Sequence, residues 1–175
     1  TKMGLAPLHT WLPDAHAEAP SVASALLSGA LLNCALLGIL RSQQLLTAAG
    51  LAPFGQRLLV VLGLVSMAWA AVFVIRQTDF KRLLAYSSVE HMGIVALGVG
   101  LGGAATFGAL LQAVNHSLVK GMLFLVSGNL LAAYRSKSTR AVRGAVRALP
   151  VSGVLWVAGL FAITGSPPFG TFLSE

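Results

Sequence analysis

The chain has 175 residues, of which 56% are hydrophobic and 10% are charged, whereas about 25% of residues are charged in soluble domains. This composition excludes a soluble globular domain and indicates an integral membrane protein. The net charge of +7 does not indicate nucleic-acid binding, because most cations lie in short links between apolar runs. Cys34 is the single cysteine, so the sequence offers neither a disulfide framework nor a cysteine metal site.

The first twenty residues, TKMGLAPLHTWLPDAHAEAP, contain three prolines and five ionisable side chains. Prolines at this density prevent one long regular helix, so we expect an unwound turn near Pro7–His9 and a short helix from about Trp11 to Ala19. Broken helices at membrane depth are typical of ion-handling sites in transporters. An interfacial loop anchored by a tryptophan explains the pattern equally well. The candidate residues here are Lys2, His9, Asp14, His16 and Glu18.

Two apolar runs follow, at 21–41 and 57–76, and each is long enough to cross a membrane. Asn33 lies near the middle of the first run. An unpaired amide is costly in lipid, so we expect Asn33 to be buried and hydrogen-bonded. The second run has almost no polar residue between its ends and is interpreted as structural. Residues 42–56, which include Pro53, are predicted to form the loop between them.

The third apolar run, at 83–102, carries polar residues in its first half. His91 lies about two turns into this run, and histidine exchanges protons more readily near neutral pH than other side chains. Glu90 is a second candidate, with solvation near the membrane surface as the alternative. The glycine-rich turn Gly98–Gly103 lacks the strand-then-helix context of a phosphate-binding loop, so it is not a dinucleotide site.

The fourth apolar run, 104–134, has Lys120 as its one permanently charged side chain. A charge near the bilayer centre costs at least about 2.5 kcal/mol, and such residues usually carry function. Gln112 and His116 precede Lys120 by two turns and one turn, and Ser127 follows at nearly the same angle, so the four form one polar stripe. The stripe predicts a protonatable relay, and a polar contact that only fixes helix packing is the alternative.

The charged links give the topology. The links at 76–82 and 135–147 fall on the same side if each run crosses the membrane, and this side holds most of the Lys and Arg. It is therefore predicted to be cytoplasmic, although a lipid-headgroup or acidic-partner contact would also explain the basic segment.

A second backbone break is expected at Ser166–Gly170. We expect one membrane domain over residues 1–175 with five spans, at 21–41, 57–76, 83–102, 104–134 and 148–165.

Four stretches together resemble one family. They are KMGLAPLHTWLPDAHAEAP from Lys2, DFKRLLAYSSVEHMG from Asp79, NHSLVKGMLFLVSG from Asn115 and GSPPFGTFLSE from Gly165. The family comprises the antiporter-like, proton-conducting membrane subunits of respiratory NADH–quinone oxidoreductases, cation/proton antiporters and energy-converting hydrogenases. The runs YSSVEHMG and LNCAL are most similar to component F of hydrogenase-4.

The resemblance implies an all-α transmembrane bundle with two discontinuous helices, and a fragment of a subunit of about fourteen helices built from inverted repeats. It implies that Lys2, His91, His116, Lys120 and Glu175 form the proton pathway. Asn33 is a departure, because many relatives have a lysine there and asparagine cannot hold a proton. Supporting positions are His9, Asp14, His16, Glu18, Asn33, Glu90 and Gln112.

The function implied by the resemblance is proton translocation within a redox-driven hydrogenase or quinone-reductase complex of the bacterial inner membrane. The partners would be other membrane subunits and lipid, and this chain would not itself be the catalytic subunit. Iron–sulfur, nickel–iron or flavin groups would lie in partner subunits only, since the sequence has no ligand set for a cluster or haem. The alternatives are a sodium or potassium/proton antiporter subunit and a structural membrane scaffold.

Overall fold

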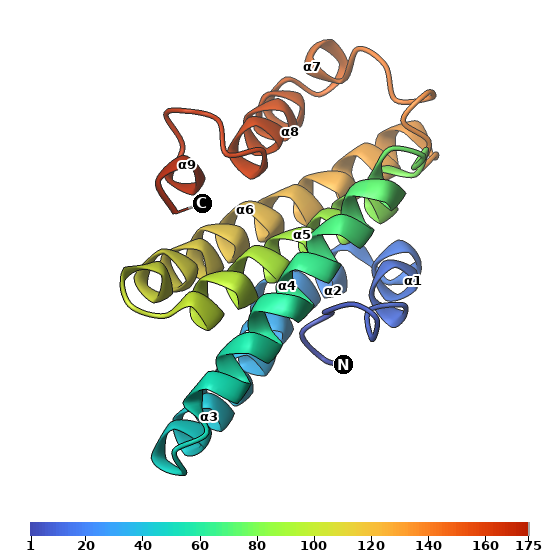
Figure 1. Ribbon diagram of the computed structural model, residues 1–175. Coiled ribbons are helices and arrows are strands. Elements are labelled where there is room, and N and C mark those ends of the chain that lie inside the picture. Colours follow the sequence, from blue (N-terminus) through green and yellow to red (C-terminus); the bar gives the residue numbers. More distant parts are fainter. Residues whose placement is uncertain (175) are drawn as a thin grey trace.

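The computed structural model describes residues 1–174, and these form a bundle of helices (Figure 1). The predicted all-helical membrane fold is confirmed. In chain order the helices are α1 (Trp11–Glu18), α2 (Ser21–Leu26), the π-helix η1 (Leu27–Leu31), α3 (Leu32–Ala48), α4 (Ala52–Val74), α5 (Phe80–Leu101), α6 (Ala104–Tyr134), α7 (Ala145–Ala148), α8 (Pro150–Ile163) and α9 (Gly170–Ser174).

Four stretches are long and apolar enough to cross a membrane, namely Ser21–Ala48, Ala52–Val74, Phe80–Leu101 and Ala104–Tyr134. The first is longer than the expected 21–41, and helix α4 begins before the expected residue 57. Pro53 had indicated a loop, but it lies in the first turn of α4, where its missing N–H removes no hydrogen bond. The expected loop at 42–56 is therefore wrong, and the link is only Ala49–Leu51.

The region predicted as a fifth span, 148–165, contains the 14-residue helix α8, which starts at Pro150. It is shorter than the about 20 residues that cross a hydrocarbon core. Backbone breaks flank both ends of the described chain. Residues before Trp11 form isolated turns, such as Gly4 N to Thr1 O at 3.0 Å, and the Pro167–Pro168 segment separates α8 from α9.

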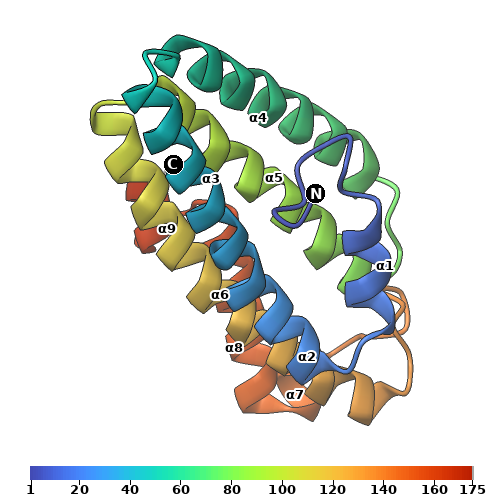
Figure 2. The ribbon, with the colours of Figure 1, turned by 90° about the horizontal axis from the view of Figure 1, so that it is seen from below.

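Helix α5 lies between α4 and α6 along most of its length (Figures 1 and 2). It approaches α4 closely because both helices have glycine at the crossing. A Cβ atom on Gly63 would lie 2.7 Å from the carbonyl oxygen of Gly93. Small residues of this kind let transmembrane helices pack backbone against backbone.

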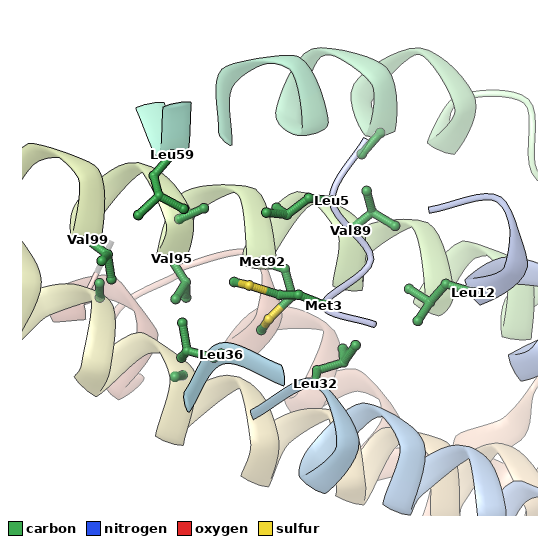
Figure 3. Close-up of a cluster of buried hydrophobic side chains, with 14 residues drawn as sticks. Met3, Leu5, Leu12, Leu32, Leu36, Leu59, Val89, Met92, Val95 and Val99 are labelled. Atoms are coloured by element: carbon green, nitrogen blue, oxygen red, sulfur yellow. The ribbon is translucent and has the colours of Figure 1, made fainter. Parts of the chain in front are cut away.

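A cluster of buried apolar side chains fills the space between α5, the start of α3 and the N-terminal segment (Figure 3). Met3 and Leu5 enter it from the N-terminal segment and meet Met92 from α5. The backbone N–H of Ala6 donates to Ser66 Oγ of α4 at 2.8 Å. The irregular N-terminal segment is therefore anchored in the bundle.

The two basic links meet at one end of the bundle. Thr139 N donates to Thr78 O at 2.8 Å, and Phe80 N donates to Lys137 O at 3.0 Å, around a β-bridge between Asp79 and Ser138. The expectation that the links at 76–82 and 135–147 share one side is consistent with these bonds.

Candidate functional site

The polar stripe of α6 faces the interior of the bundle. Gln112, His116, Lys120 and Ser127 each have 0% of their surface exposed, although they lie on a helix whose other faces carry exposed apolar side chains such as Leu118. Ser127 donates to Phe124 O at 2.6 Å. Ser127 also lies 3.5 Å from Ser21 Oγ of α2. Gln112 and Lys120 bond to groups of other helices, and His116 has two ring nitrogens without a partner among residues 1–174, so these three form the centre of the candidate site.

Lys120 reaches the backbone of α5. Its Nζ atom donates to Leu84 O at 2.5 Å and also to Ser87 Oγ. The ion pairs that the structure shows among residues 1–174 do not include Lys120. A fully buried lysine whose hydrogen bonds go to a carbonyl and a hydroxyl oxygen can give up its proton without breaking an ion pair.

A cavity of about 330 Å³ adjoins these partners. Ser87, Glu90 and His91 line it from α5, and Leu160 and Ile163 line it from α8. A cavity of this size with polar groups on one wall can hold water. Glu90 is half-buried on the wall of this cavity.

Gln112 joins three helices. Its Nε2 atom lies 3.0 Å from His91 Nδ1 of α5, and its Oε1 atom accepts a hydrogen bond of 2.6 Å from Ser174 Oγ of α9. Ser174 also accepts a bond of 3.0 Å from Asn115 Nδ2. The described end of α9 is thereby connected to His91. Glu175, the predicted acid of this region, lies outside the described residues.

His116 continues the series toward Lys120. Its ring centroid is 5.5 Å from that of His91, and Lys120 follows one helical turn later. Both ring nitrogens of His116 are buried without a hydrogen-bond partner among residues 1–174. Each unsatisfied buried polar group costs about 1–3 kcal/mol, and a site that retains two of them requires an explanation other than packing.

His16 approaches the same site from α1, outside the four long apolar helices. Its ring stacks on Phe124 of α6 with centroids 4.7 Å apart, and neither ring nitrogen has a hydrogen-bond partner among the described residues. The pKa of the His16 imidazole is lowered to about 4, first by burial and then by the ammonium groups of Lys120 and Lys81. His16 is therefore neutral at physiological pH and lies within electrostatic reach of both lysines.

Asn33 does not contact the stripe directly. Its Nδ2 atom donates to Ser117 Oγ of α6 at 2.6 Å and to Gly29 O at 3.2 Å, which agrees with the expectation of a hydrogen-bonded amide. Its Oδ1 atom is buried without a partner among residues 1–174. Since Ser117 lies three residues before Lys120, Asn33 fixes α3 to α6 beside the site.

The remaining candidates lie away from the stripe. Lys2 is exposed and lines a separate cavity of about 440 Å³ with residues of α3 and α4. Asp14 pairs with Arg82 at 2.8 Å and Glu18 with Lys137 at 3.6 Å, both near the surface. His9 is buried edge-on against Trp69, with ring centroids 5.6 Å apart.

Three residues of the site region were missed as candidates. Ser87 and Ser174 are bonded to Lys120 and Gln112, and Lys81 is 2% exposed, with its Nζ atom donating to Ala19 O at 2.7 Å. The four-residue spacing of Ser87 and His91 was one usable signal for Ser87. Lys81 lies within the charged link at 76–82, whose cations were used only for topology. No cluster of metal-ligating side chains is found in the described part of the chain.

Comparisons with known proteins agree on one family. The family model described as NADH:quinone oxidoreductase/Mrp antiporter, transmembrane, matches residues 1–175. A hydrogenase-4 component F homolog of Methylacidiphilum infernorum is 47% identical over 176 residues, which are 100% of this chain and 37% of that protein. Hydrogenase-4 component B of Escherichia coli is 35% identical over 99% of this chain and 28% of its own length.

Chain 4 of the NADH-ubiquinone oxidoreductase of Chondrus crispus is 36% identical over 99% of this chain and 35% of its own length. Among solved structures, an archaeal membrane-bound sulfane sulfur reductase contains a similar chain, with a TM-score of 0.91 and 26% identity over 97% of this chain and 35% of that one. The Mrp complex of a Dietzia species shares the fold, with a TM-score of 0.80 and 23% identity over 99% and 32% of the two chains.

The chain thus spans about a third of the length of the proteins it matches. The family model covers it from end to end, and the predicted resemblance to antiporter-like subunits and to hydrogenase-4 component F is confirmed. This chain belongs to the NADH:quinone oxidoreductase/Mrp antiporter transmembrane family.

Proposed function

We propose that the chain is the central part of a proton-translocating membrane subunit, and that Lys120 is the residue that loads and releases the proton. The observation that carries this proposal is the environment of Lys120. It is fully buried and is held by Leu84 O and Ser87 Oγ. The His116 ring lies one turn away on the same stripe, with the His91 ring of α5 beyond it.

The connected polar groups define a route across the α5–α6 interface. Ser174, Gln112 and His91 are joined by hydrogen bonds, and His116 bridges the step from His91 to Lys120. A neutral imidazole accepts a proton on one nitrogen and releases one from the other. The unpaired nitrogens of His116 would be satisfied by water during transfer, and Glu175 would extend the route beyond Ser174.

Lys2 and Asn33 would lie on the other branch of the route. Asn33 cannot hold a proton, so transfer past it would depend on water near Ser117, whose Oγ donates to Gly29 O at 3.0 Å. Lys2 would exchange protons from the cavity that it lines with α3 and α4. His9, Asp14, Glu18 and Glu90 would have supporting roles through charge and hydration.

The driving reaction would take place in partner subunits. The named relatives are components of hydrogenase-4 and of NADH-quinone oxidoreductases, so we infer a redox-driven complex of the bacterial inner membrane with the basic links on the cytoplasmic side. Iron–sulfur, nickel–iron or flavin groups would lie in those partners. A sodium or potassium/proton antiporter is the second candidate, because the matching family model also covers Mrp antiporters.

The test replaces Lys120 by Ala in the full-length subunit within its assembled complex. Proton uptake into inverted membrane vesicles should be lost, whereas Lys137→Ala at the bundle end should retain it. Unchanged uptake in the assembled Lys120→Ala complex would exclude the relay role and leave a scaffold. Sodium and potassium gradients should not alter uptake in the redox-driven case, and a dependence on either gradient identifies the antiporter.

A further inference from the structure

Two lysines bind the C-terminal end of α1, but their surroundings differ. Lys81 Nζ donates to Ala19 O at 2.7 Å, and Lys137 Nζ donates to Ala17 O at 2.7 Å. Cations at the carbonyl end of a helix stabilise it, which accounts for both bonds. Lys137 is half-buried beside Glu18, whereas Lys81 is 2% exposed. Helix stabilisation alone does not require a nearly buried lysine.

Lys81 of α5 lies one helical turn before the residue whose carbonyl oxygen binds Lys120 of α6. That residue is Leu84, and Lys81 itself belongs to the first turn of α5. His16 approaches these residues from α1, since its ring rests on Phe124, one turn beyond Lys120 on α6. A buried imidazole with two unpaired nitrogens therefore lies within electrostatic reach of both lysines.

We propose that His16 and Lys81 form the port through which Lys120 exchanges protons with the basic-link end of the bundle. This inference rests on the proposed function and identifies one entrance for the protons that reach Lys120. In the loading direction, protonated Lys81 gives a proton through water to one nitrogen of His16. The other nitrogen passes a proton to neutral Lys120. Lys81 becomes a neutral amine and regains a proton from solvent near Glu18 and Asp79, so one proton moves for each cycle.

Local contacts support each step. Ser24 Oγ donates to His16 O at 3.1 Å, which fixes the α1 backbone at that residue while leaving the ring nitrogens available. The Lys81 Nζ atom donates to a backbone carbonyl oxygen, and the ion pairs shown among residues 1–174 do not include Lys81, so a deprotonated Lys81 breaks no ion pair there. The cavity beside Ser87 and Glu90 is the competing entrance.

The experiment compares three variants of the full-length subunit in its assembled complex. His16→Phe keeps an aromatic ring on Phe124 but cannot carry a proton. Lys81→Arg keeps a cation that can donate to Ala19 O, but arginine does not release its proton. Lys137→Arg is the matched control, with the same substitution and the same type of bond at the same helix end. Assembly is checked on native gels, and His16→Gln replaces His16→Phe if that variant does not assemble.

Proton uptake into vesicles should fall about 10-fold or more in His16→Phe and Lys81→Arg, within the range of losses seen when a proton-transfer group is removed. Lys137→Arg should remain within about 2-fold of the parent, and the double variant His16→Phe/Lys81→Arg should be no worse than either single one, because the two residues act in series.

Normal uptake in both single variants would overturn the port, as would an equal loss in Lys137→Arg, which would show that both lysines only hold α1. Lys120→Ala separates the two proposals: loss of uptake there, with normal uptake in His16→Phe and Lys81→Arg, rejects the port and retains the proposed function.

Discussion

Helix α5 has two neighbours, and the two interfaces differ in kind. Against α4, glycines bring the backbones together, and a Cβ on Gly93 would lie 2.9 Å from Gly63 O. Against α6, a Cβ on Gly98 would also lie 2.9 Å from Ala105 O, but around His91 and Lys120 the contacts are made by long polar side chains, and a cavity adjoins them. The first interface is close-packed and fixes geometry. The second contains unpaired nitrogens of His116, so it has groups that can change protonation.

The largest expected effect comes from a substitution at the close-packed α4–α5 crossing. Gly63→Leu should prevent stable insertion, because its side chain would collide with the α5 backbone, and overpacking of this kind costs about 3 kcal/mol or more. Gly38→Leu is the control, since no atom lies within 4 Å of a Cβ built there. The amount of subunit in purified membranes measures the effect. Equal amounts of the two variants would show that the crossing is not close-packed.

Gln112→Leu tests the polar interface without changing its size. The substitution removes the bonds to His91 and Ser174, so we expect proton uptake to fall about 10-fold while the complex still assembles. Gln112→Glu, which keeps an acceptor for Ser174, should retain more uptake than Gln112→Leu. Uptake is measured per assembled complex in vesicles, and wild-type uptake in Gln112→Leu would remove this residue from the route.

Ser66→Ala is the corresponding change at the α4 side. Ser66 is fully buried, accepts from Ala6 N at 2.8 Å and donates to Leu62 O at 2.6 Å. Leaving Ala6 N–H unsatisfied should lower the free energy of unfolding by about 1–3 kcal/mol. Thermal denaturation should report the loss, while uptake per assembled complex stays unchanged. A loss of uptake as large as that of Gln112→Leu would abolish the distinction between the interfaces.

Arg82→Gln gives the smallest expected effect. Arg82 and Asp14 form an ion pair at 2.8 Å with side chains that are 43% and 71% exposed. Exposed pairs contribute about 0–1 kcal/mol, so both thermal stability and proton uptake should remain close to those of the parent. Adding salt should change the thermal stability of the parent and of the variant by the same amount. A marked loss in either measurement would place this pair among the functional contacts.

The polar stripe could be predicted because it depends only on spacing. Gln112, His116 and Lys120 follow each other at four residues, and a regular helix places them on one face whatever surrounds it. Their partners could not be predicted in the same way. Lys120 binds the carbonyl oxygen of Leu84, and a backbone acceptor leaves no trace in residue type.

Single positions were misjudged where the same residue type has two uses. Pro53 suits both a loop and the first turn of a helix, and only the structure shows the second. Lys81 follows an N-cap, where a cation usually marks a membrane surface, yet its side chain folds inward to Ala19. Lys2 matches a family motif and lines a cavity with α3 and α4, so its place in the proton pathway stays a prediction.

The pairing of the two basic links has a mechanical consequence. Helices α5 and α6 are joined at one end by Gly102 and Gly103, and at the other end the backbone bonds of Thr78–Phe80 with Lys137–Thr139 tie them together again. The two helices therefore form a closed frame. Neither can slide by a turn along the other without breaking one of the two ties, so the register that faces His91 toward His116 is locked. Side-chain rotation and exchange of solvent are the movements that leave both ties intact.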